Sequence, residues 1–237
     1  MKFAAGDAAY FKRRKALSDA MGPRELWSMI DHWPLYCGIG NLGRVLAIVD
    51  LFRQTMTVPG HVAEFGTWRG ATLMLLAKVL KLADPHGQKI VHCFDSFEGL
   101  TAFSSADGQA RSSEGAYRGN LEELRQMIEL YELGDDVDIH EGLIETTLPA
   151  FLAQRPEVSF SFVYCDTDLY ASTKTILESI HPRLTLGGVF VLDEWNYESY
   201  PGETVAVREF TAAHSTEYEM LHVPGTRQPS LVLKRVR

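Results

Sequence analysis

From residue 61 onward, short apolar runs alternate with segments whose apolar residues recur at helical spacing, and this alternation constrains the fold more than any other feature. Short apolar runs are typical of buried strands, and a repeat of three to four residues is typical of amphipathic helices. Five runs predict strands at His61–Gly66, Lys89–Phe94, Asp136–His140, Phe160–Cys165 and Gly188–Leu192. The predicted helices are Ala71–Ala83, a segment marked by Leu121 to Tyr131, Leu143–Gln154, Ser172–Ile180 and Thr204–His214. Such alternation predicts an α/β fold, with a mostly parallel sheet covered on both faces.

The last two apolar runs, Tyr218–Val223 and Ser230–Arg235, have no helix between them. Their connection, Pro224–Pro229, is too short for a crossover between parallel strands, so we expect an antiparallel hairpin at the sheet edge. The pattern therefore predicts a seven-stranded, mostly parallel sheet with an antiparallel C-terminal hairpin strand. In such sheets ligands bind beyond the carboxyl ends of the strands, near the point where the strand order reverses.

The first 58 residues differ from the rest, because their helical-looking pieces are interrupted at Gly22-Pro23, at Pro34 and across residues 38–43. Residues 44–56 regain helical spacing, and Val58-Pro59-Gly60 then breaks the chain. We predict a helical N-terminal segment at residues 1–58 and one main domain at residues 59–237.

Charge and cysteine content narrow the class of partner. The net charge of −8, from 31 acidic and 23 basic residues, disfavours a nucleic-acid binder, which usually displays a basic face. The sequence has no 18-residue apolar stretch and no secretion signal at its N-terminus, so no membrane partner is expected. The three cysteines, Cys37, Cys93 and Cys165, are widely spaced, which suggests a reducing compartment and predicts a cytoplasmic location.

The first strand is followed by Glu64-Phe-Gly66-Thr67-Trp68-Arg-Gly70, at the position where a nucleotide-binding loop belongs. Trp68 takes the place of the glycine that lets a pyrophosphate approach the backbone in dinucleotide-binding folds. An acid at Glu64 suits an ammonium group, and amides at the start of the helix suit a carboxylate. The loop therefore favours a ligand with an amino-acid tail, although these glycines could also serve the backbone alone.

A second candidate, Asp95-Ser96, ends the second strand 25 residues after Gly70. An acid in this place commonly holds ribose hydroxyls in nucleotide-binding α/β folds. The competing interpretation is that Asp95 caps a short helical turn.

Four acids follow the fourth and fifth strands: Asp166, Asp168, Asp193 and Glu194. If these strands are neighbours, the carboxylates converge at one edge of the sheet and repel one another. Mg²⁺, Mn²⁺ or Ca²⁺ would relieve that cost, because all three ions suit hard oxygen ligands. The competing interpretation is that Asp168 caps the following helix and Glu194 points to solvent.

Four strings of this sequence together resemble the macrocin O-methyltransferase family over about residues 60–215: AEFGTWRGAT, FDSFEGL, DTDLYASTKTILESIHPRLTLGGVFVLDEW and PGETVAVREF. The resemblance implies the Rossmann-like fold of class I methyltransferases that use S-adenosylmethionine. It further implies methyl transfer to a hydroxyl, usually on the sugar of a natural product, with bound Mg²⁺ or Mn²⁺.

The resemblance also assigns residues. Its cofactor loop falls on Glu64 and Gly66, and its ribose motif falls on Asp95 and Ser96. Thr67 and Gly70 of the same loop are further candidates for cofactor binding. Its metal-binding acids fall on Asp166, Asp193 and Glu194, with glutamate at Glu194 where the family usually has a second aspartate.

The mechanism implied is in-line attack of a hydroxyl oxygen on the methyl carbon, with a cation lowering the pKa of the hydroxyl. Asp166 is a candidate general base, and His140, at the end of the third strand, is a second candidate, although a lone histidine there is more often structural. The alternatives are a methyltransferase without a metal, a nicotinamide-dependent oxidoreductase and a binding module without catalysis.

We expect the less regular segments of the chain to bind the acceptor. Residues 1–58 and the Ser-, Gly- and Ala-rich stretch 101–118 are predicted to shape the acceptor pocket as lids, with Glu114 and Tyr117 as candidate contacts. The expected partner is a small, glycosylated acceptor. The aromatic residues Trp27, Trp33 and Tyr36 would suit either a lid or the interface of a homo-oligomer.

Overall fold

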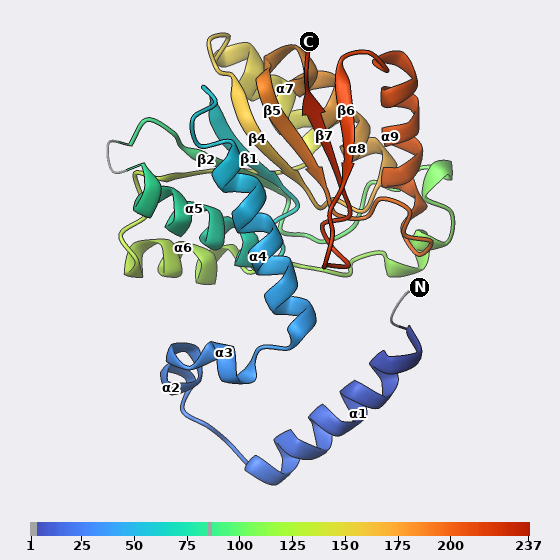
Figure 1. The fold of residues 1–237 in the computed structure, drawn as a ribbon. Helices are drawn as coiled ribbons and strands as arrows, with labels where there is room; N and C mark the ends of the chain where they lie inside the picture. The colour runs from blue at the N-terminus through green and yellow to red at the C-terminus, as the bar shows by residue number, and fades with distance from the viewer. Residues whose placement is uncertain (1–3, 85–86) are drawn as a thin grey trace. The chain divides into compact units, whose positions relative to one another are not determined.

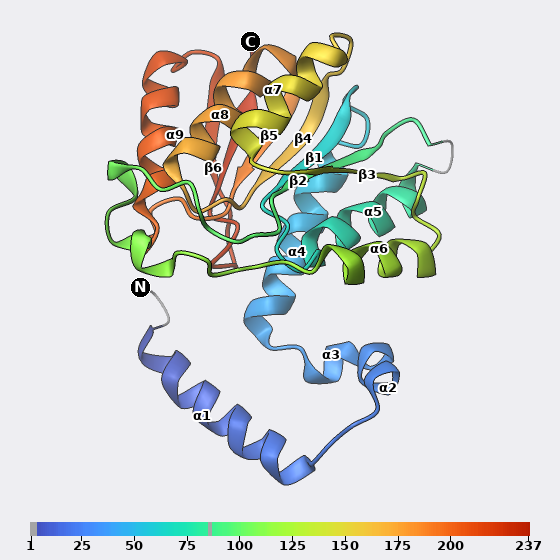
Figure 2. The same ribbon diagram turned by 180° about the vertical axis from the view of Figure 1, so that it is seen from behind.

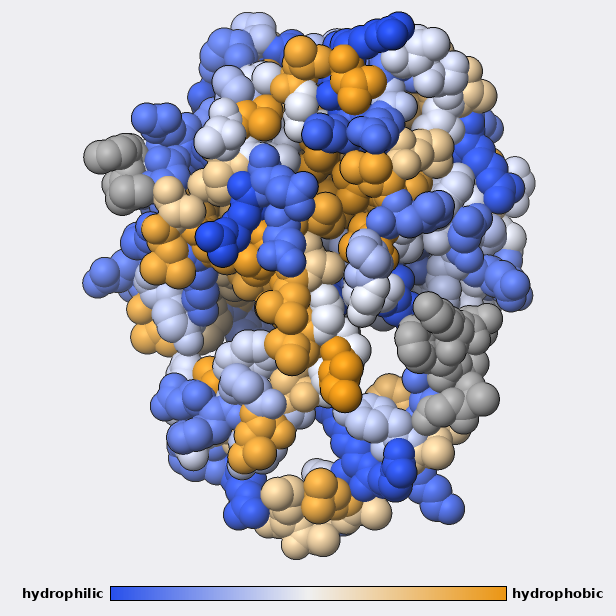
Figure 3. All heavy atoms as spheres, in the orientation of Figure 1, coloured by the Kyte–Doolittle hydropathy of each residue, from blue (hydrophilic) through white to orange (hydrophobic). Residues whose placement is uncertain are grey.

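The structure, a computed structural model, describes residues 4–84 and 87–237, and its contacts divide the chain into two compact units, one up to Leu42 and one from Gly43 to Arg237. The first unit holds three helices, α1 (Ala4–Met21), α2 (Leu26–Asp31) and α3 (Trp33–Tyr36), and the start of α4 (Ile39–Gln54). Its helices α2 and α3 contain no buried residue. Apolar side chains are therefore exposed among hydrophilic ones on these helices (Figure 3), including Leu26, Ile30 and Leu35.

The second unit contains a seven-stranded sheet in the order β3-β2-β1-β4-β5-β7-β6. Its strands are β1 (His61–Phe65), β2 (Val91–Asp95), β3 (Val137–Glu141), β4 (Phe160–Cys165), β5 (Leu184–Leu192), β6 (Tyr218–His222) and β7 (Leu231–Arg235). The first five strands are parallel, and β7 runs antiparallel between β5 and β6. These pairings confirm the predicted sheet and its antiparallel hairpin. The hairpin forms because the link between β6 and β7 is too short for a crossover between parallel strands.

Helices cover both faces of this sheet (Figures 1 and 2). On one face, apolar residues of α4, α5 (Ala71–Ala83) and α6 (Leu121–Leu130) form a core with one set of strand side chains, including Ile48, Leu76 and Tyr164. On the other face, α7 (Ile144–Gln154), α8 (Tyr170–Ile180) and α9 (Pro201–Ala213) pack on the alternate set, including Phe94, Phe151 and Phe190. Burial on both faces explains why the central strands lack a polar alternation.

Two segments differ from their predicted form. The stretch 101–118, expected to be a long loop, contains a 3₁₀ segment at Ser105–Ser113. Its buried Asp107 accepts hydrogen bonds from the Ser104 amide at 2.6 Å and the Tyr170 amide at 2.7 Å, which ties the segment to the start of α8. The N-terminal boundary also differs, since Ile48 and Phe52 of α4 are buried in the core of the larger unit, which begins at Gly43 rather than after residue 58.

The strand order reverses between β1 and β4: β2 and β3 are added on one side of β1, and β4 and β5 are added on the other. At this switch point the carboxyl ends of β1, β2, β4 and β5 come together, as the parallel registers require. The predicted cofactor and metal residues lie at or shortly after these four strand ends, whereas His140 lies in β3.

Among the described residues, none of the helices combines the length and the apolar character that a membrane span requires.

Candidate functional site

The loop after β1 depends on two glycines for its shape. Gly66 has a φ of +81°, and a Cβ at this position would lie 1.9 Å from the carbonyl oxygen of Asp166. Gly70 has a φ of +82°, and a Cβ there would lie 2.5 Å from Leu124 Cδ1. The backbone conformation disfavours other residues at both positions, and at Gly66 the backbone carbonyl of Asp166 also leaves no room for a side chain. The prediction that they also bind a cofactor stays a prediction.

Asp95, at the end of β2, organises this loop. Its Oδ2 accepts hydrogen bonds from the amides of Thr67 at 2.5 Å and Trp68 at 2.9 Å, and its Oδ1 accepts one from the Phe97 amide at 2.6 Å. Ser96 Oγ accepts a bond from the Glu98 amide at 3.2 Å. Since each carboxylate oxygen has two acceptor sites, the Phe97 amide leaves one site on Oδ1 open, and its use by a ribose hydroxyl stays a prediction. Asp95 thus joins the ends of β1 and β2 around the predicted cofactor site.

Glu64, near the end of β1, is buried beneath the same loop. Its Oε2 accepts a hydrogen bond from Thr67 Oγ1 at 2.6 Å. Burial raises the pKa of the Glu64 carboxyl to about 8, with the nearby charge of Asp95 acting in the same direction. The group is therefore mostly protonated at neutral pH, and an approaching cation would favour its ionised form.

Three carboxyl groups gather at the ends of β4 and β5. Asp166, Asp168 and Glu194 each offer one oxygen, and these oxygens all lie within 4.8 Å of one another. Burial, reinforced by neighbouring acids, raises the pKa of Asp168 to about 7 and that of Glu194 to about 9. Gln228 Nε2 donates to Glu194 Oε1, whereas the buried Glu194 Oε2 has no partner among the described residues. This donor set fits a hard divalent cation, which takes oxygen ligands and would supply the missing partner.

Asp193, the fourth predicted acid, is engaged differently. Arg44 Nη1 donates to both of its oxygens, at 2.8 and 2.7 Å, while Arg44 Nη2 donates to Asp166 Oδ2 at 2.8 Å. The Tyr164 hydroxyl donates to Asp193 Oδ1 at 2.5 Å. A guanidinium group therefore stands between two of the three predicted metal ligands.

Arg44 was not among the site residues expected from the sequence. The residue lies 149 positions from Asp193 and 122 from Asp166, so no local spacing could connect it with either acid. The sequence signal is only a basic residue at the start of an otherwise apolar helical stretch, which is ordinary in helices.

An aromatic group borders the loop. Trp68, which has a φ of +49°, makes an edge-to-face contact with Tyr117 at 5.5 Å between ring centroids. The Tyr117 hydroxyl lies 3.1 Å from that of Tyr200, a residue that the sequence analysis did not single out. Tyr117 is 42% exposed, so it is available to a ligand, and its role as an acceptor contact stays a prediction.

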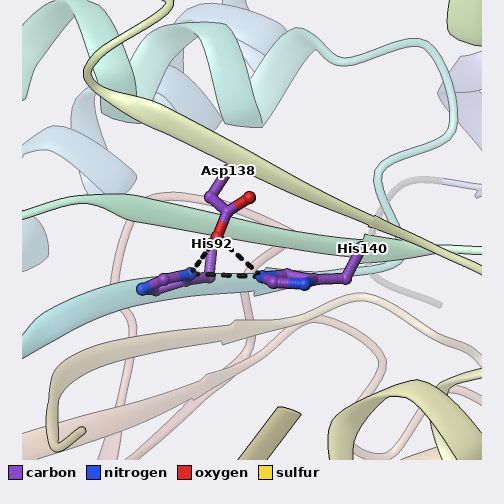
Figure 4. A group of neighbouring side chains, drawn as sticks. All are labelled: His92, Asp138 and His140. Carbon is purple, nitrogen blue, oxygen red and sulfur yellow. Dashed lines mark hydrogen bonds and ion pairs between the residues drawn. The ribbon is translucent and has the colours of Figure 1, made fainter. Parts of the chain in front are cut away.

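His140, the second candidate base, lies in another group. Its ring stacks on Phe94 at 4.3 Å between centroids, and its Nε2 lies 3.2 Å from His92 Nδ1. Figure 4 shows this group, which includes Asp138 and connects β2 with β3. The candidate base Asp166, in contrast, lies in the acid group.

The fold and the glycine loop at the switch point define the class of protein: the chain has the class I methyltransferase fold. The family model of the macrocin-O-methyltransferases (TylF) matches residues 31–227, and the chain belongs to this family. The resemblance found in the sequence is thereby confirmed.

Two curated relatives are each 30% identical to the chain. One is the 8-demethyl-8-(2,3-dimethoxy-alpha-L-rhamnosyl)-tetracenomycin-C 4'-O-methyltransferase of Streptomyces olivaceus, aligned over 71% of this chain and 64% of its own. The other is the demethyldecarbamoylnovobiocin O-methyltransferase of Streptomyces niveus, aligned over 70% of this chain and 63% of its own. The chain thus spans somewhat less than two thirds of the length of these relatives.

Solved structures agree on the fold. The calicheamicin methyltransferase CalS11 superposes with a TM-score of 0.82 at 25% identity, covering 94% of this chain and 90% of its own. A Bacillus cereus O-methyltransferase in complex with S-adenosylhomocysteine shares the fold alone, with a TM-score of 0.53 at 15% identity over 95% of this chain and 97% of its own.

Proposed function

We propose that this chain transfers the methyl group of S-adenosylmethionine to a hydroxyl on the sugar of a natural product, with the help of a divalent cation. The observation that carries the proposal is the group Asp166, Asp168 and Glu194, with an unpartnered buried oxygen, beside the glycine loop of a family whose relatives are named as methyltransferases of glycosylated compounds. The cofactor would lie along Glu64–Gly70 and Asp95, and the acceptor beyond the acid group.

The residues of the chain have distinct parts in this reaction. Asp95 and the two loop glycines shape the cofactor site, and the ribose hydroxyls would use the free acceptor site of Oδ1. Asp166 and Glu194, together with Asp193 or Asp168, would hold Mg²⁺ or Mn²⁺, which supplies a positive charge that lowers the pKa of the acceptor hydroxyl. Asp166 is the predicted proton acceptor.

One observation favours a second candidate function, a methyltransferase that needs no metal. The Arg44 guanidinium already forms ion pairs with both Asp166 and Asp193 without any metal ion. In that case Arg44 would be the permanent cation of the site, and the acids would act only through hydrogen bonds.

We also propose that residues 1–58 and 101–118 shape the acceptor pocket, as the sequence predicts. The exposed apolar side chains of α2 and α3 support this role, because such surfaces gain free energy when a ligand or a second copy covers them. Hydrogen exchange that is identical with and without cofactor and acceptor in both segments would remove the lid hypothesis. The proposed location is the cytoplasm.

A radiolabelled methyl-transfer assay tests both functions. The purified chain is incubated with labelled S-adenosylmethionine and a panel of rhamnosylated and other glycosylated aglycones, first with a chelator and then with added Mg²⁺ or Mn²⁺. We expect transfer that the chelator abolishes and the metal restores. Full turnover in the chelator would establish the metal-free alternative, and tighter binding of NADH than of S-adenosylhomocysteine would exclude both.

A further inference from the structure

A second group of potential ligands lies away from the acids, between the neighbouring strands β2 and β3. His92 comes from β2, and Asp138 and His140 come from β3. The parallel register pairs His92 with Asp138 and Phe94 with His140, and residues two apart on a strand share a face. The three side chains therefore meet on the sheet face that α7 covers, where His92 and His140 pack on Phe151 at 4.9 and 4.6 Å between centroids.

The geometry points to a binding site for a divalent transition ion such as Zn²⁺ or Co²⁺, which we propose is held by His92 Nδ1, His140 Nε2 and an Asp138 carboxylate oxygen. Figure 4 shows the two imidazole rings facing each other through these nitrogens, with the carboxylate pointing toward the gap between them. The sites proposed above for the cofactor and for Mg²⁺ do not use any of these three groups.

The separations between the three ligand atoms match tetrahedral coordination. His92 Nδ1 and His140 Nε2 are 3.2 Å apart, and Asp138 Oδ2 lies 3.5 Å from the first and 3.3 Å from the second. Ligands placed about 2.0–2.1 Å from a tetrahedral Zn²⁺ lie about 3.3–3.4 Å from one another. An ion can thus be placed at bonding distance from all three atoms with only small shifts.

Protons alone cannot satisfy the same three contacts. If one nitrogen carries a proton, the other nitrogen and the carboxylate face each other as two acceptors. If both facing nitrogens carry protons, both can donate to Asp138, but the two N–H groups then oppose each other. A cation accepts a lone pair from all three groups at once, so it removes this conflict.

The environment keeps the imidazoles ready for a metal. Burial, with the neighbouring histidines, lowers the pKa of His92 to about 4, and burial also lowers the pKa of His140, so both rings are neutral at pH 7. His92 Nε2 has no partner among the described residues, so nothing there prevents Nδ1 from presenting its lone pair. Asp138 is about half exposed, which gives an ion an entry path and leaves room for a water as fourth ligand.

This site differs chemically from the acid group at β4 and β5. Two imidazoles and one carboxylate favour Zn²⁺ or Co²⁺, whereas three carboxylates favour Mg²⁺ or Mn²⁺. The ion would fasten the edge strand β3 to β2, whose last residue is Asp95. The next turn is already attached there, because the Gly142 amide donates to the Asp95 carbonyl at 3.0 Å. We therefore infer a stabilising role at the cofactor side of the sheet.

A third group, His181, His214 and Glu217, serves as an internal control. Its ring nitrogens already form hydrogen bonds within the protein: His181 Nδ1 lies 2.8 Å from the Tyr218 hydroxyl, and His214 Nδ1 lies 2.8 Å from Glu217 Oε1. The remaining pair, His181 Nε2 and Glu217 Oε2, is 3.7 Å apart. His214→Gln thus removes one imidazole without touching the proposed site.

The test is a Co²⁺ and Zn²⁺ titration of the full chain without a histidine tag, with excess Mg²⁺ present to occupy the acid group. We expect one equivalent of Co²⁺ to give the intense visible absorption of four-coordinate cobalt, Zn²⁺ to displace it, and Zn²⁺ to raise the melting temperature. Asp138→Asn and His140→Gln should each weaken Zn²⁺ binding about tenfold or more, and His214→Gln should leave it unchanged.

Two results would overturn the proposal: no four-coordinate cobalt spectrum, or a Zn²⁺ affinity equal in the wild type and the two site variants. Because Asp138 is half exposed, Asp138→Asn is expected to fold even if His140→Gln does not. Methyl transfer is not part of the readout, so the outcome is independent of the proposed reaction.

Discussion

Asp193 and Glu194 are successive residues that directly follow β5, and both are buried. Asp193 is paired with a cationic side chain, whereas Glu194 is paired with a neutral one. Asp193 faces the α4 side of the sheet, where Arg44 and Tyr164 donate to it. Glu194 lies with Asp168 and Gln228, and no protein cation contacts it among the described residues. Neighbours on a chain thus need not share a neutralising partner, because successive side chains point to different surroundings.

The largest expected effect comes from removing the protein cation. In Arg44→Met, the buried Asp193 loses its ion pair, and we expect unfolding in urea with chelator to show a loss of about 3–5 kcal/mol. Added Mg²⁺ should restore part of this loss if the ion can take the place of the guanidinium. Arg44→Lys is the matched control, because it keeps the charge and loses the bidentate geometry. Equal stability of wild type and Arg44→Met would show that the ion pair is not formed in solution.

Asp193→Asn tests whether this acid is a metal ligand as well as a partner of Arg44. The change keeps the shape and removes one charge, so turnover should fall on the order of 10²-fold, while affinity for S-adenosylmethionine changes little. Steady-state kinetics and calorimetry measure the two quantities separately. If both fell in parallel, Asp193 would be acting on the cofactor site.

A smaller effect, on cofactor affinity, is expected from a change at Asp95, at the end of β2. Asp95→Ala removes the acceptor for the amides of Thr67, Trp68 and Phe97, and S-adenosylhomocysteine affinity should fall by about 1–3 kcal/mol in calorimetry. Glu98→Ala, at a nearby exposed acid, is the control and should bind normally. Unchanged affinity in Asp95→Ala would remove Asp95 from the cofactor site.

The remaining prediction concerns the pH dependence of stability and Glu64, a buried acid that, like Glu194, has a raised pKa. Its pKa is about 8 in the folded chain against an ordinary glutamate value of 4.5, so the folded protein holds a proton that the unfolded chain has released. Stability should therefore fall as pH rises from about 4.5 to about 8. Glu64→Gln keeps the acceptor for Thr67 and should flatten this slope in urea titrations at several pH values. An unchanged slope would mean that Glu64 is ionised in the folded state.

The sequence by itself determined the order of strands and helices along the chain, the antiparallel C-terminal hairpin and the family. It also determined which strands are followed by acids. These features follow from local periodicity, chain breaks and short motifs, which any segment carries within a few residues. The tertiary structure alone decided which charges meet: Arg44 reaches acids 122 and 149 residues away, Asp95 holds the amides of the preceding loop, and His92 meets His140 through strand pairing. The physical reason is that neutralising a buried charge depends on distance in space, and the packing of α4 and the register of β2 with β3 set that distance.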